Sequence, residues 1–171
     1  MSNIEYGDPI APERSRSATA SRPEFEQPTA IAALFNRLFG VLVGLGFGPM
    51  NSYLLEVRGR KSGRLYSTPV HLLTLHGKDF LVAPRGRTQW VRNVEASGEV
   101  SLKRGTSRRQ FRLRAIPDAE RPEILKAYLD GFKSTVQGYF PIPAGSPATA
   151  FVSIAPYYPV FELVPRLAPP A

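Results

Sequence analysis

The chain has 171 residues, 43% of them hydrophobic and 21% charged, which suits one domain with a substantial core. It has no cysteine and two histidines, which excludes disulfides and thiolate catalysis and leaves little for a metal site or a catalytic triad. We therefore expect no metal. The net charge of +8 and the pI of about 10.1 predict attraction to an anionic partner, such as a phosphate, a polyanion, nucleic acid or an anionic membrane surface.

The first part of the chain predicts a tail and then a helix. Residues 1–28 combine four prolines, several serines and mixed charges, which is typical of a disordered segment, and they lack the apolar core of a signal peptide. We therefore expect a cytoplasmic protein. From Thr29 onward, apolar residues at helical spacing predict a helix over 29–43. This helix could pack on the domain or lie on a membrane surface, and residues 29–171 are predicted to form a single domain.

From Ser52 onward the hydrophobic period changes to two. It predicts strands over 53–58, 65–75, 80–84, 100–104, 108–115 and 159–164. A short helix is expected within 85–97, and a second helix from Pro117, with Asp118 as its N-cap. Short strands in hairpins with flanking helices predict an α+β fold, built on an antiparallel barrel of about six strands.

The turn after the first strand is the most unusual segment. It reads G-R-K-S-G-R over residues 59–64 and, with Arg58, carries four cations. Their mutual repulsion favours a bound anion, although a solvated surface turn is the alternative. The segment is not a P-loop, because Arg60 stands where that motif needs glycine. Arg60 and Lys61 can supply charge-assisted donors, Ser62 a hydroxyl and the backbone further N–H groups, which together suit a phosphate.

Several segments in this order resemble a known family. The turn at 59–64, Ser67-Thr68-Pro69-Val70, the loop 83–86 and Trp90-Val91-Arg92-Asn93 are similar to the deazaflavin-dependent nitroreductases, members of the split β-barrel flavin and deazaflavin oxidoreductases. The similarity runs from about 52 to 105 and includes the last strand. It implies binding of coenzyme F-420, with FMN as the alternative, and hydride transfer to a quinone, a nitroaromatic or an activated C=C bond. The short loop before Trp90, which lacks the expected proline, departs from the nitroimidazole-reducing members.

The resemblance also implies site residues. The expected cofactor-binding residues are Arg60, Lys61, Ser62, Gly63, Ser67, Thr68, Pro69, Val70, Ala83, Arg85, Gly86, Trp90 and Asn93. Tyr139, Tyr157 and Tyr158 lie where the family presents tyrosines to the substrate, with core packing as the alternative.

Other functions remain open from the sequence. The same fold could hold a deazaflavin, a flavin, haem or a lipid without turnover. A nucleic-acid-binding barrel is less favoured, because the aromatic residues do not interleave with the cations. We expect a small hydrophobic or electrophilic substrate and no specific nucleic acid, with a homodimer as one open oligomeric state.

Overall fold

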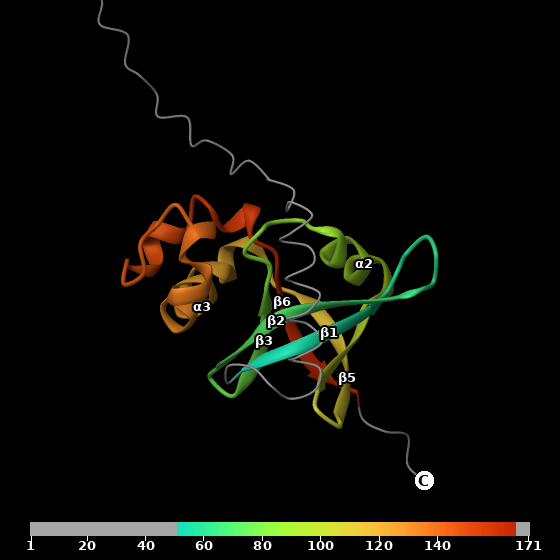
Figure 1. Cartoon of the computed structure of the whole chain (residues 1–171). Helices are drawn as coiled ribbons and strands as arrows, with labels where there is room; N and C mark the ends of the chain where they lie inside the picture. Colours follow the sequence, from blue (N-terminus) through green and yellow to red (C-terminus); the bar gives the residue numbers. More distant parts are fainter. Residues whose placement is uncertain (1–50, 167–171) are drawn as a thin grey trace, which may run out of the picture.

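The computed structural model describes residues 51–166, and six strands in that part of the chain close into one barrel. The predicted tail over 1–28 and the predicted helix over 29–43 lie outside the described residues. The strands are β1 (Ser52–Arg58), β2 (Leu65–Leu75), β3 (Lys78–Val82), β4 (Glu99–Arg104), β5 (Ser107–Ala115) and β6 (Val160–Pro165). Their order around the barrel is β1-β2-β3-β6-β5-β4, and every neighbouring pair is antiparallel (Figure 1). The predicted α+β barrel is therefore confirmed.

Two helices flank the barrel. The first, α2 (Gln89–Ser97), lies on the side toward which the β1–β2 turn projects. The second, α3 (Arg121–Val136), lies on the other side, together with several short 3-10 turns (Figure 1). The long β1–β2 hairpin keeps a continuous antiparallel register from Ser52↔His71 to Arg58↔Leu65. This register places the cationic turn at one end of the hairpin and His71 at the other.

The strand walls separate two apolar clusters. One cluster draws residues from all six strands and from α2, including Leu55, Leu81 and Phe111, and fills the barrel. The other lies between the barrel and α3 and includes Phe80 and Leu125. Because successive strand residues point to opposite faces, β3 contributes Phe80 to one cluster and Leu81 to the next. The strand is therefore apolar on both faces.

The start of α3 differs from the prediction. Asp118 was expected as the N-cap, but residues Asp118–Glu120 form a 3-10 turn and α3 begins at Arg121. Pro122 has no backbone N–H, which costs nothing in the first turn of a helix but would remove an intrahelical hydrogen bond if the helix were capped at Asp118. Asp118 forms an ion pair with Arg121 at 2.7 Å instead of capping. Among residues 51–166, no helix has the length and apolar character needed to cross a bilayer.

Candidate active site

The cationic turn is built around two glycines. The Gly63 N–H donates to the carbonyl oxygen of Gly59 at 2.8 Å, and the Gly59 N–H donates to that of Arg64 at 2.8 Å. Gly63 has a φ of 65°, in the left-handed region where glycine is least strained. A Cβ at Gly59 would overlap the ring of Tyr66. The conformation of the turn thus depends on both glycines.

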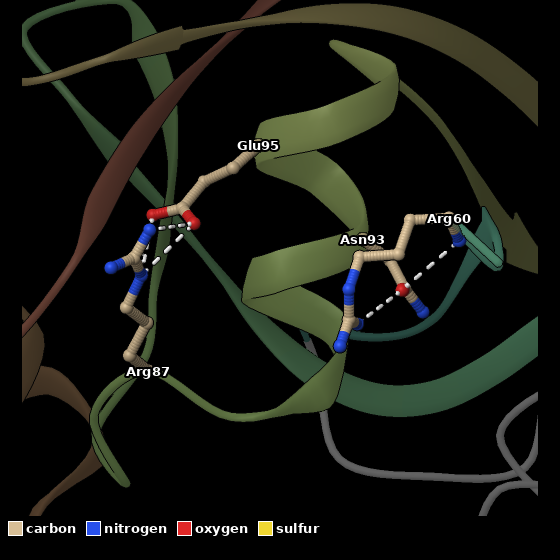
Figure 2. A network of polar contacts seen from close by, with 4 residues as sticks. All are labelled: Arg60, Arg87, Asn93 and Glu95. Atoms are coloured by element: carbon tan, nitrogen blue, oxygen red, sulfur yellow. Dashed lines mark hydrogen bonds and ion pairs between the residues drawn. The ribbon is translucent and has the colours of Figure 1, made fainter.

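Asn93 attaches this turn to α2. Its side chain is 2% exposed, and its Oδ1 accepts hydrogen bonds from the backbone N–H of Arg60 at 3.3 Å and from the Arg60 guanidinium at 3.0 Å. Figure 2 shows this contact on one side of α2 and the ion pair between Arg87 and Glu95 on the other. Asn93 therefore joins two segments 33 residues apart instead of making a bond at the helix end.

The cations of the turn have no acidic partner in the described part of the chain. None of the four forms an ion pair there, and Arg58 instead donates to the carbonyl oxygen of Gly63 at 3.3 Å. The nearby Arg108, in contrast, pairs with the buried carboxylate of Glu56 at 2.8 Å. Cations that have no acidic partner in the described residues attract an anionic group.

A cavity of about 460 Å³ lies beside the turn, bounded by β1, β2, the loop after β3, α2 and α3. Its volume is within the range typical of sites for small molecules and cofactors. It brings together eight of the predicted site residues, namely Ser67, Thr68, Pro69, Val70, Arg85, Trp90, Asn93 and Tyr139. Trp90 also packs against Phe161, with ring centroids 6.0 Å apart, so it serves both the core and the cavity.

The remaining predicted residues lie outside the cavity lining. Of the turn residues Arg60, Lys61, Ser62 and Gly63, two contact the lining. Arg60 donates to Asn93 at 3.0 Å, and the Ser62 hydroxyl lies 3.3 Å from that of Tyr66. Ala83 is buried in the barrel cluster, and Gly86 has a φ of 71° in the loop that follows. Both residues shape the backbone of that loop, since the Gly86 N–H donates to the carbonyl oxygen of Ala83 at 3.0 Å.

The three predicted tyrosines have different environments. Tyr139 lines the cavity and is 44% exposed, with the Arg85 guanidinium 5.8 Å from its ring centroid. Tyr158 is buried, stacks on Phe140 and donates its hydroxyl to the carbonyl oxygen of Tyr139 at 2.7 Å. Burial raises the pKa of Tyr158. Tyr157 is on the surface and does not line the cavity.

The structure adds lining residues that the sequence analysis missed. His71 and Tyr128 are both part of the cavity wall. Burial lowers the pKa of His71 and raises the pKa of Tyr128, with the charge of Tyr139 contributing further to the second shift. His71 had no recognisable motif, and Tyr128 matched the pattern of a helix core residue. Only the packing of α3 over β2 brings both to the cavity.

One buried polar atom at the cavity has no partner. Thr88 occupies the N-cap position of α2 and lines the cavity, yet its hydroxyl neither caps the helix nor finds another hydrogen-bond partner in the described residues. A buried hydroxyl without a partner costs free energy, which a bound ligand can recover. The cavity and this hydroxyl, together with cations that have no acidic partner in residues 51–166, suit a ligand that carries an anionic group.

The fold is a closed six-stranded antiparallel barrel with two flanking helices. The family model described as F420H(2)-dependent quinone reductase matches residues 31–135, and the chain belongs to this family. It is therefore an F-420-dependent oxidoreductase, and the predicted cofactor, coenzyme F-420, is confirmed by that membership. No curated protein matches the chain.

Solved structures resemble the chain at low identity. The F420-H2 dependent reductase FDR-A is 21% identical with a TM-score of 0.45, over 67% of this chain and 94% of that one. A protein described as a domain-swapped dimer is 20% identical with a TM-score of 0.48, over 78% and 96%. Atu2129 of Agrobacterium tumefaciens, of unknown function, is 17% identical with a TM-score of 0.50, over 85% and 59%. The similarity to Atu2129 concerns the fold alone.

Proposed function

We propose that the protein transfers a hydride from reduced coenzyme F-420 to an electrophilic small molecule, with quinones as the preferred class and nitroaromatics or activated C=C bonds as further acceptors. The observation that carries the proposal is the docking of the turn onto α2 by Asn93. It attaches a cationic turn, without acidic partners among residues 51–166, to a cavity whose surface is largely apolar. A cofactor with a phosphate at one end and a flat ring at the other needs this combination.

The proposed roles divide the predicted residues between the two ends of the cofactor. Arg60, Lys61, Ser62 and the backbone at Gly63 would bind the phosphate. Each charge-assisted contact would contribute about 1.5–3 kcal/mol. The ring and its sugar-like chain would lie along Ser67, Thr68, Pro69, Val70, Ala83, Arg85, Gly86, Trp90 and Asn93. Family membership and the shared cavity support this assignment.

The bound cofactor supplies the hydride, and the chain supplies binding and orientation. The cavity lies between the strands and the two helices, so it would hold the hydride donor and the acceptor close together. Its largely apolar surface would limit the water around them. Arg85 is the charged side chain among the described lining residues, and its guanidinium lies 5.8 Å from the ring centroid of Tyr139. Tyr139, at the exposed edge of the cavity, would contact the substrate from the solvent side.

Two measurements test the proposal. Titration of coenzyme F-420 into the protein should show saturable binding, read from the fluorescence of the cofactor. The reduced cofactor should then be oxidised with menadione as acceptor and less rapidly without it. No binding at micromolar cofactor would refute the proposal. Binding without oxidation by menadione or a nitroarene would show a cofactor-binding protein instead, and preferential binding of FMN would exclude a deazaflavin role.

The assembly and extent of the domain are also open to measurement. We propose that residues 29–171 form the catalytic domain, so removing residues 1–28 should leave F-420 binding unchanged. A homodimer is proposed by analogy with the domain-swapped dimer among the similar structures. Light scattering on the purified chain would distinguish a dimer of about 38 kDa, twice the 18.9 kDa of one chain, from the monomer.

A further inference from the structure

His71 has an ordered position in the cavity wall. It lies on β2, opposite Ser52 of β1 in the antiparallel register. Its ring stacks on Phe132 of α3, with centroids 4.7 Å apart and planes 13° from parallel. The side chain is half-buried and belongs to the cavity lining. The imidazole is therefore held by neighbours on two elements.

One ring nitrogen of His71 has a partner and the other does not. Nδ1 lies 3.4 Å from the hydroxyl oxygen of Ser52, whose residue is 2% exposed. Neither that hydroxyl nor Nε2 has any other hydrogen-bond partner in residues 51–166. A serine hydroxyl that donates to Nδ1 leaves the ring proton on Nε2. Nε2–H is then a donor that the described chain leaves free.

The charge state of the ring fits this arrangement. Burial lowers the pKa of His71, so the neutral imidazole is the form present at neutral pH. The ionisable groups that share the cavity are Tyr66, Tyr128, Tyr139 and Arg85, and no carboxylate is among the described lining residues. Nothing described there would stabilise an imidazolium, whereas a neutral N–H donor needs no counterion.

We propose that His71 is a catalytic residue that donates its Nε2–H to the acceptor oxygen of the substrate, a quinone carbonyl or a nitro group, with Ser52 setting the tautomer. This inference rests on the proposed function and assigns the substrate end of the same site. Reduction of a quinone consumes one hydride and one proton. The hydride leaves the reduced cofactor oxidised by two electrons, and negative charge develops on the acceptor oxygen. His71 stabilises that charge, and the proton that completes the hydroquinone comes from solvent.

Three substitutions of His71 separate its atoms. His71→Phe keeps the stack on Phe132 and removes both nitrogens. His71→Gln places an amide nitrogen near the position of Nε2, whereas His71→Asn places one near Nδ1 only. The matched control is His76→Gln, because His76 is exposed in the β2–β3 turn and does not line the cavity.

The expected pattern follows from the loss of one hydrogen-bond donor to a developing oxyanion. His71→Phe and His71→Asn should lower kcat with menadione about 100-fold, and His71→Gln should recover most of it. The Kd for coenzyme F-420, measured by fluorescence, should change less than twofold in every variant. The control should match the wild type in both measurements.

A spectroscopic measurement tests the tautomer without turnover. In nitrogen-15 NMR of the imidazole, the wild type should show the proton on Nε2, and Ser52→Ala should give a mixture of tautomers and a lower kcat. A proton on Nδ1 in the wild type would overturn the proposal, as would unchanged kcat in His71→Phe with F-420 bound. Failure of the wild type to bind F-420 would overturn the proposed function as well, so the two failures are distinguishable.

Discussion

Asn93→Ala is the sharpest test of how the phosphate-binding turn is held. The substitution removes the one side chain through which α2 binds the backbone and the guanidinium of Arg60. It leaves the fold of the turn itself intact, since the turn closes through its own backbone bonds around Gly59 and Gly63. The expected result is a correctly folded barrel in which the turn is no longer attached to the cavity.

The magnitude follows from the two hydrogen bonds lost. A bond to a charged donor contributes about 1.5–3 kcal/mol, and a neutral backbone bond about 0.5–1.5 kcal/mol. Together they predict a loss of about 2–4 kcal/mol in the free energy of unfolding. In the variant, part of the binding free energy must be used to order the detached turn. Each 1.4 kcal/mol used in this way should weaken F-420 affinity about tenfold. We expect affinity to fall about 10- to 100-fold.

The matched control is Arg87→Ala, on the same helix. Its ion pair with Glu95 lies on the other side of α2 and is exposed to solvent (Figure 2). Exposed pairs contribute little to stability, so this variant should unfold and bind F-420 as the wild type does. Urea denaturation and fluorescence titration of both variants provide the comparison. Equal stability and equal affinity in Asn93→Ala and Arg87→Ala would refute the claim that Asn93 positions the turn.

Three further predictions concern the turn and the cavity. Lys61→Ala should weaken F-420 binding about 10- to 100-fold. Lys78→Ala removes another exposed lysine, which pairs with Glu162, and should leave binding unchanged. Equal effects of the two substitutions in a fluorescence titration would indicate non-specific attraction. Gly59→Ala should destabilise the fold by about 1–3 kcal/mol in urea, because its Cβ overlaps a neighbouring aromatic ring, while Gly131→Ala meets open space and should be neutral or stabilising. The pKa of His71 is lowered below its unfolded value of 6.5, so its contribution to stability is complete above pH 6.5 and is lost as pH falls through the folded pKa. His71→Gln should lack this loss, and parallel stability–pH curves for the two proteins would contradict the assignment.

The sequence predicted the barrel because its strands have a strong local pattern. Alternating apolar residues flank glycine turns throughout 52–115, and hairpins of this kind form from neighbouring segments. It also predicted a short helix within 85–97 that carries Trp90 and Asn93, and residues three apart on a helix share a face. Both now line one cavity. The predicted start of α3 was wrong. Asp118 is a favourable cap in isolation, but Pro122 lacks the N–H that a helix capped there would need.

The amino-acid sequence by itself determined the strands, their hairpins and the cationic turn, since each depends on residues close together in the chain. Tertiary structure alone decided what that turn touches and what closes the cavity. Arg60 and Asn93 are 33 residues apart, and His71 meets Phe132 only because α3 packs over β2. The hydroxyl of Thr88 and the Nε2 of His71 have no hydrogen-bond partner within residues 51–166, and this depends on how distant elements pack around them. The hydrophobic period of a segment specifies the face of the helix or strand on which a side chain lies. The residue that the side chain contacts depends on how distant elements pack.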